Sequence, residues 1–150
     1  MADKLEVDLV VSKSQLQYVN RNDWVLILDK AKYLSFKKDE TLIQQGKQPA
    51  MVFVIMNGKA QIRNSFGAII AHISPGEICG EMAFLENTHA SASVVAEEAM
   101  VVYGIDWPIL QDLFELYPQI ASRFYRSLAV SLSRRLRGQI SRTPSEPARK

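Results

Sequence analysis

Between residues 33 and 105 the chain alternates short apolar stretches with turn-forming residues, and this rhythm limits the folds that it can adopt. Turns with glycine, proline, asparagine or aspartate separate the stretches. The stretches are Tyr33–Phe36, Thr41–Ile43, Met51–Met56, Ala60–Ile62, Ala68–Ala71, Ala92–Ala96 and Met100–Ile105. Strands this short, with turns roughly every 8 to 12 residues, are typical of antiparallel sandwiches and barrels. The sequence therefore predicts a mainly β fold.

The pair Asn57-Gly58 predicts a tight hairpin inside this region. Both central residues of a type I′ turn have positive φ, and asparagine and glycine adopt that conformation most readily. We therefore expect the strand before Asn57 to pair with the strand that begins near Ala60.

Helical patterns flank the strand-rich region. Asn22 or Asp23 can cap a short helix with an apolar side, formed by Trp24, Leu26, Ile27 and Ala31. Asp106-Trp107-Pro108 is typical of a second helix start, because proline is tolerated in the first helical turn. Tyr117-Pro118 restarts the chain into a long helix that ends near Gly138 or Arg142.

The long helix is predicted to be amphipathic. At 100° per residue its apolar stripe is Ala121, Tyr125, Leu128, Leu132 and Leu136, and its arginine stripe is Arg123, Arg126, Arg134 and Arg137. A helix from Pro118 to Arg142 is roughly 37 Å long, longer than a small barrel needs to cover itself. We expect its distal half to pack on a second copy or on another protein.

Length and composition are those of one globular domain. We divide it into an N-terminal arm over residues 1–20, a domain over residues 21–142 and a flexible tail over residues 143–150. The arm holds one strand-like stretch, Leu9–Val11. No apolar run approaches the length of a membrane span. The single cysteine cannot form an internal disulfide, so we expect a reducing cytoplasm.

Basic residues are concentrated at the C-terminal end. Residues 1–120 hold 10 lysines and arginines against 15 acidic residues, whereas residues 121–150 hold 8 against 1. A solvated helix face is the ordinary role of such an arginine stripe, and nucleic-acid contact is the alternative.

The segment from Ile73 to Ala96 carries the most specific motif. It contains Pro75-Gly76-Glu77, then Gly80-Glu81-Met82-Ala83, and later Ser91-Ala92-Ser93-Val94. This segment resembles the phosphate-binding cassette of cyclic nucleotide-binding domains of the catabolite-activator and protein kinase A regulatory-subunit type. The resemblance implies an antiparallel β-roll (a double-stranded β-helix or jelly roll) with an N-terminal helix and a long C-terminal helix. Asp39 stands where such domains usually have glycine, so we expect left-handed backbone there.

The resemblance also implies a ligand-binding set within this cassette. The set is Gly80, Glu81, Met82, Ala83, His89, Ala90, Ser91, Ala92 and Ser93. In such domains the glutamate at the position of Glu81 accepts a hydrogen bond from the ribose 2′-hydroxyl. Ser91 and the amides around it would contact the exocyclic phosphate oxygens, although Ser91 and Ser93 can equally bond the backbone of the cassette.

The sequence departs from the family pattern at Ala90. The family's phosphate-pairing arginine stands nine residues after the glutamate, and that position is Ala90 here. A bidentate arginine–phosphate pair contributes about 1.5 to 3 kcal/mol, so its loss should weaken a cyclic nucleotide by roughly tenfold to over a hundredfold. His89, Arg63 or an arginine of the last helix could supply another cation.

Two functions of different class remain open. The first is a regulatory sensor that binds cAMP, cGMP or another nucleotide-like ligand and passes the signal through the helices after Asp106. The second is a ligand-free module that dimerises or docks on a protein through its last helix, with its pocket filled by side chains such as Met82 or Phe84.

An enzyme, a metal site and a DNA-binding domain are not expected. The only histidines are His72 and His89, seventeen apart, which does not fit the ligand pattern of a cupin metal site. No nucleophile elbow or phosphate-binding loop occurs. Family members that bind DNA carry a helix-turn-helix after the long helix, and the chain stops before one could form.

Overall fold

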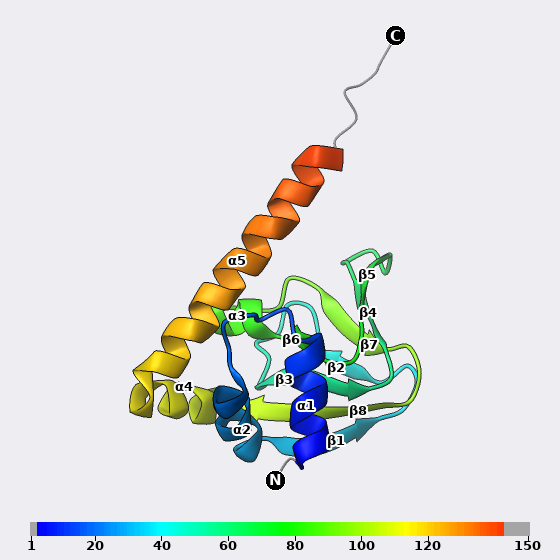
Figure 1. Ribbon diagram of the computed structural model, residues 1–150. Helices are drawn as coiled ribbons and strands as arrows, with labels where there is room; N and C mark the ends of the chain where they lie inside the picture. The colour runs from blue at the N-terminus through cyan, green and yellow to red at the C-terminus, as the bar shows by residue number, and fades with distance from the viewer. Residues whose placement is uncertain (1–2, 143–150) are drawn as a thin grey trace.

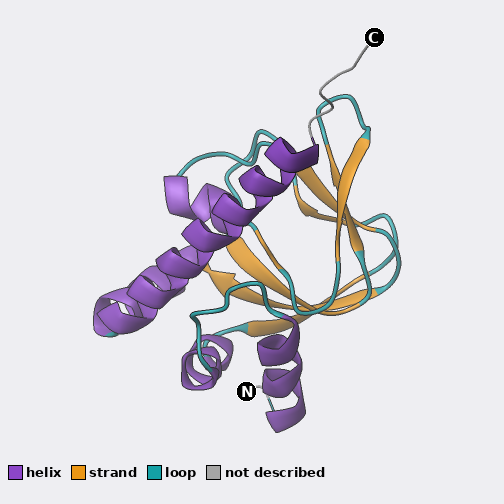
Figure 2. Cartoon of the chain, turned by 45° about the horizontal axis from the view of Figure 1, so that its top comes forward, coloured by secondary structure: helices purple, strands orange, loops and turns teal. Residues whose placement is uncertain are grey.

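The computed structural model describes residues 3–142 as two antiparallel sheets with helices on one side (Figures 1 and 2). The elements are α1 (Lys4–Lys13), α2 (Arg21–Asp29), β1 (Lys32–Phe36), β2 (Thr41–Ile43), β3 (Met51–Asn57), β4 (Ala60–Arg63), β5 (Ile69–Ile73), β6 (Ile78–Cys79), α3 (Glu81–Glu86), β7 (Ser93–Ala96), β8 (Met100–Asp106), α4 (Trp107–Leu116) and α5 (Pro118–Arg142). This is the predicted β-roll with flanking helices. The predicted tail, residues 143–150, lies outside the described residues.

Each sheet has four strands, in the orders β1-β8-β3-β6 and β2-β7-β4-β5. A hydrophobic cluster between the two sheets contains Phe53 and Ile55 of β3. A second cluster, between the first sheet and the helices, contains Val52, Val54 and Met56 of the same strand. Strand β3 is therefore buried on both faces, which explains why its sequence is uniformly apolar instead of alternating.

The first half of α5 is fixed to the helices beside it. The guanidinium of Arg123 donates two hydrogen bonds to the carboxylate of Asp23, with Nε–Oδ2 and Nη2–Oδ1 distances of 2.7 and 2.8 Å. Nearby, the backbone N–H of Tyr18 donates to Ser127 Oγ, and the Arg126 guanidinium lies 4.1 Å from the centroid of the Tyr18 ring. The second half of α5 extends past the sheets (Figure 1).

Two predictions about the N-terminal region are wrong. The strand-like stretch Leu9–Val11 belongs to helix α1, which begins with a capping box between Asp3 and Glu6 and buries Val7 and Val10. Helix α2 is capped by Asn20 and not by Asn22 or Asp23. Asp23 is the acidic partner in that capping box, because its side chain accepts a hydrogen bond from the Asn20 backbone N–H.

The Asn57-Gly58 hairpin is also wrong. Strand β3 pairs with β6 and β8, whereas β4 pairs with β5 and β7, so this turn carries the chain from one sheet to the other. Gly58 has a φ of 80°, but positive φ is absent at Asn57. Glycine is required at position 58 because a Cβ there would overlap the backbone oxygen of Ala99. Asp39, in contrast, has the expected left-handed conformation, with a φ of 72°.

The buried face of α5 overlaps the predicted stripe only in part. Leu128 of that stripe is buried and Ala121 packs against the core, but Tyr125 and Leu136 are 43% and 60% exposed. Ile120 and Phe124, outside the stripe, are buried. Over the first half of the helix, the face next to the predicted stripe packs on the protein. In the second half, Leu136 and Ile140 are exposed.

We expect Gly58→Ala to destabilise the protein by about 2 to 5 kcal/mol, because left-handed backbone and steric overlap act together. Gly67→Ala is the matched control, since Gly67 has a φ of 81° but nothing within 4 Å of an added Cβ. It should cost only about 1 to 2 kcal/mol, the strain of the backbone alone. Urea unfolding measures both, and equal losses would contradict the steric role of Gly58.

Candidate ligand pocket at the cassette

The centre of the cassette is a short helix, α3, between two residues in left-handed conformation. Gly80, with a φ of 86°, precedes α3, and Asn87, with a φ of 53°, follows it. Gly80 lies against β3, because a Cβ at this position would come within 3.0 Å of the Met51 backbone oxygen. The close approach fixes the start of α3 on the central strand of the first sheet.

The loop after α3 is fastened to the turn between β2 and β3. The backbone N–H of Ala90 donates to the Lys47 oxygen, and the Gly46 N–H donates to the Ala90 oxygen, both at 2.9 Å. The Gln45 N–H donates to Ser93 Oγ at 3.0 Å. The backbone around Ala90 is therefore held in place even though the side chain at this position is small.

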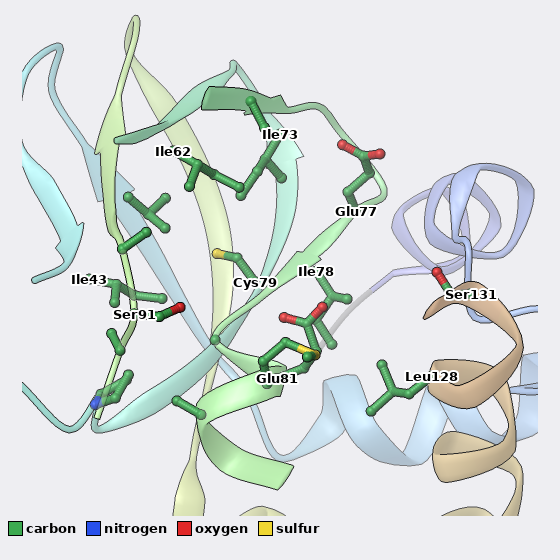
Figure 3. Close-up of a pocket in the computed structure, with 18 of the residues that line it drawn as sticks. Ile43, Ile62, Ile73, Glu77, Ile78, Cys79, Glu81, Ser91, Leu128 and Ser131 are labelled. Atoms are coloured by element: carbon green, nitrogen blue, oxygen red, sulfur yellow. The ribbon is translucent and has the colours of Figure 1, made fainter. Parts of the chain in front are cut away.

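A cavity of about 750 Å³ opens beside the cassette (Figure 3). Most of its wall is apolar, with side chains from the second sheet, β6, α3 and α5. The apolar residues include Ile43, Ile62, Ile73, Ile78, Met82, Val94 and Leu128. Glu81 projects into the space between the strands and α5, and Ser91 lies on the opposite side of the cavity (Figure 3).

The structure brings together all but one of the predicted site residues along this cavity. Those that line it are Gly80, Glu81, Met82, Ala83, His89, Ala90, Ser91 and Ala92. Ser93 lies outside the lining, and its hydroxyl accepts the backbone hydrogen bond from Gln45. The ligand-binding role of the whole set stays a prediction.

The aromatic residue of α3 points away from the cavity. The Phe84 ring lies 5.7 Å from the Trp107 ring of α4 and 6.1 Å from the Phe114 ring, both in edge-to-face geometry. Phe114 in turn lies 5.1 Å from Phe124 of α5. These rings connect the cassette helix to both C-terminal helices, and Phe84 does not fill the pocket.

Of the three sources of a replacement cation, two reach the cavity. His89 is part of its lining, but Arg63 is not, since its guanidinium donates to Gln61 Oε1 on the same strand. Arg135 of α5 also lines the cavity. Arg135 is not part of the predicted arginine stripe. Its spacing from Leu128 and Ser131, at i, i+3 and i+7, puts the three on one helix face.

Burial raises the pKa of two side chains at the cassette, Glu81 and Cys79. Burial raises the pKa of the Glu81 carboxyl above its ordinary value, while the backbone N–H groups of Glu81 and Met82 and the charge of Arg135 act in the opposite direction. Burial, and to a smaller extent the charge of Glu81, raises the pKa of the Cys79 thiol far above the usual range. Cys79 therefore stays protonated and unreactive at neutral pH.

Residues 3–142 show neither a cluster of metal-ligating side chains nor a membrane-spanning helix. No group of three or more histidine, cysteine, aspartate or glutamate side chains in this range is placed to hold a metal ion. Within the same range, none of the helices combines the length and hydrophobicity that crossing a bilayer requires.

Replacing Glu81 should change how stability depends on pH. Because its pKa is raised in the folded state, ionising Glu81 costs folding stability, and this cost develops as pH rises from about 4.5 through the folded pKa. We expect Glu81→Gln to increase the unfolding temperature more at pH 7 than at pH 4. Thermal unfolding at both pH values tests this, with Glu86→Gln as the control for removing a carboxylate from α3. An equal effect of Glu81→Gln at both pH values would contradict the raised pKa.

Comparison with known proteins agrees with this geometry. The family model described as "Cyclic nucleotide-binding domain" matches residues 33–117. Cyclic GMP-binding protein C of Dictyostelium discoideum is 27% identical over 137 residues, which cover 83% of this chain and 5% of that protein. The chain thus spans a small part of the length of this curated relative.

Solved structures share the fold. A cyclic nucleotide-binding domain from Methylobacillus flagellatus superposes with a TM-score of 0.76 at 18% identity, covering 91% of this chain and 81% of the other. The regulatory subunit of a cAMP-independent protein kinase A from Trypanosoma brucei gives a TM-score of 0.65 at 19% identity, covering 74% and 43%. With the family match extending over more than half of its residues, the chain belongs to the cyclic nucleotide-binding domain family.

Proposed function

We propose that the chain is a non-catalytic sensor whose cavity binds a nucleotide-like ligand and whose C-terminal helices respond to that binding. The observation that carries this proposal is the open cavity between the cassette and α5. The ligand-free alternative requires side chains to fill the pocket. Phe84 packs instead on Trp107 and Phe114, and Met82 lies in the wall of a space that stays open.

The ligand need not be the one that other members of the family bind. Ala90 offers no charge to a cyclic phosphate, and the name of the Trypanosoma brucei relative describes a kinase that is independent of cAMP. Support for a ligand of nucleotide size comes from the volume of the cavity, and Glu81 supplies a hydrogen-bond acceptor within it. A cyclic nucleotide with altered affinity, or a related molecule, fits this combination.

The aromatic contacts suggest how binding reaches the helices. Movement of α3 would press Phe84 against Trp107 at the start of α4, and Phe114 would carry the displacement to Phe124 of α5. The free thiol of Cys79 is compatible with a reducing compartment, and we propose the cytoplasm as the site of action.

Introducing the missing arginine tests the sensor. We expect Ala90→Arg to strengthen cAMP or cGMP binding by roughly tenfold to a hundredfold, because one bidentate phosphate pair contributes about 1.5 to 3 kcal/mol. Isothermal titration of the wild-type and variant proteins measures this. The same titrations in a Trp24→Phe background leave Trp107 as the single tryptophan, so a change in its fluorescence reports movement at α4. No binding of either nucleotide to Ala90→Arg would contradict a nucleotide-shaped cavity.

A second role, in association, is favoured by one observation on α5. Leu136 and Ile140 are one turn apart and are 60% and 64% exposed. We propose that they pack against a second copy or another protein, in addition to the sensing role.

Sedimentation tests self-association through this surface. The wild-type protein should dimerise at high concentration, and the double substitution Leu136→Glu and Ile140→Glu should weaken the dimer at least about tenfold, because charges would replace an apolar contact. Arg134→Glu, on the other side of the helix, is the control. A wild-type protein that remains monomeric would rule out the homodimer.

A further inference from the structure

One permanently charged basic side chain lines the described part of the cavity, and it belongs to α5 and not to the two sheets, which we call the barrel. Among the described residues that line the cavity, Arg135 is the only lysine or arginine. The cation belongs to α5, whose Leu128 and Ser131 contribute to the same wall. The neighbouring Arg134 does not line the cavity, because the next residue on a helix is rotated by about 100°.

Arg135 is available to a ligand. Arg21 pairs with Asp8 and Arg123 with Asp23, but within residues 3–142 no ion pair joins the Arg135 guanidinium to a carboxylate. Arg135 and Glu81 both line the cavity, and the positive charge of Arg135 acts to lower the pKa of the Glu81 carboxyl.

The acidic side chains that line the cavity are Glu77, Glu81 and Glu86, and within residues 3–142 none of them forms an ion pair with Arg135. Glu77 accepts hydrogen bonds from Gln15 Nε2 and from the Ser74 backbone N–H, so the protein itself occupies its carboxylate. His72 is paired with Glu97 at 2.7 Å. Glu81 is in a buried position that disfavours its ionised form.

We propose that Arg135 is the cationic contact for an organic phosphate monoanion of nucleotide size in this cavity, so that α5 and not the barrel binds the ligand's charge. The inference rests on the proposed sensor function and goes beyond it by naming the residue and the charge of the ligand. An arginine in the barrel would hold an anion equally well wherever α5 lay. An arginine on α5 makes phosphate binding depend on the position of that helix, and the anion joins the helix to the cassette.

This arrangement predicts a distinctive dependence on residue 135. Charge-assisted contacts are strong and sensitive to salt when they are partly exposed. Arg135→Gln should weaken cAMP binding at least about tenfold and should reduce the effect of added NaCl on the dissociation constant. Arg135→Lys keeps the charge and should retain most of the affinity. Arg134→Gln, which removes the same charge outside the cavity, should change the affinity less than about twofold.

The decisive experiment is a double-mutant cycle with cAMP as the probe, measured by isothermal titration of the wild-type, Ala90→Arg, Arg135→Gln and doubly substituted proteins. If Arg135 replaces the missing cassette arginine, Arg135→Gln has a large effect in the wild-type background. The same substitution has a much smaller effect in the Ala90→Arg background, where the cassette supplies its own cation.

The remaining outcomes separate this inference from the sensor function. Binding by Ala90→Arg but not by the wild-type protein, or wild-type binding that Arg135→Gln leaves unchanged, overturns the role of Arg135 and preserves the sensor. Equal losses in Arg135→Gln and Arg134→Gln also overturn it, because they indicate a general charge effect. Absence of cAMP binding in all four proteins overturns both proposals.

Discussion

Burial of β3 on both faces is the constraint on which the other parts of the structure depend. The strand contributes Phe53 and Ile55 to the core between the sheets, and Val52 and Val54 to the core beneath the helices. It also contacts the cassette, since Gly80 lies so close to β3 that an added Cβ would come within 3.0 Å of the Met51 backbone oxygen. Strand β3 thus contacts the second sheet on one face, the helices on the other, and the start of the cassette helix.

Predictions from the sequence succeeded where a local pattern decides the structure. The strand rhythm, the left-handed Asp39 and the start and length of α5 all depend on residues close together in the chain. The hairpin predicted at Asn57-Gly58 was wrong. Gly58 is required there because its backbone packs against Ala99, a residue 41 positions away, and local turn chemistry cannot show that contact. Helix α1 was missed because the run Leu9-Val10-Val11 is locally typical of a strand, and the capping box of Asp3 with Glu6 was not recognised beside it.

In the candidate site, too, the residues of one local motif were predictable, and contacts from distant parts of the chain were not. Motif spacing located the cassette residues along one cavity except Ser93, whose hydroxyl accepts a backbone hydrogen bond from Gln45, the alternative role that the sequence left open. Arg135 enters the site from another element, and no spacing within the cassette could identify it. Only the packing of α5 on the sheets brings its helix face, with Leu128 and Ser131, into the cavity wall (Figure 3).

The attachment of α5 has a mechanical consequence. Arg123 and Ser127 hold the helix to α2 and to the segment before it, and from Ser127 to Arg142 the helix extends for about 22 Å at about 1.5 Å per residue. A rotation of about 10° around this attachment would displace the far end by about 4 Å, at that length. With this attachment α5 has the geometry of a lever, in which a small rotation near Ser127 would become a larger displacement at the far end of the helix.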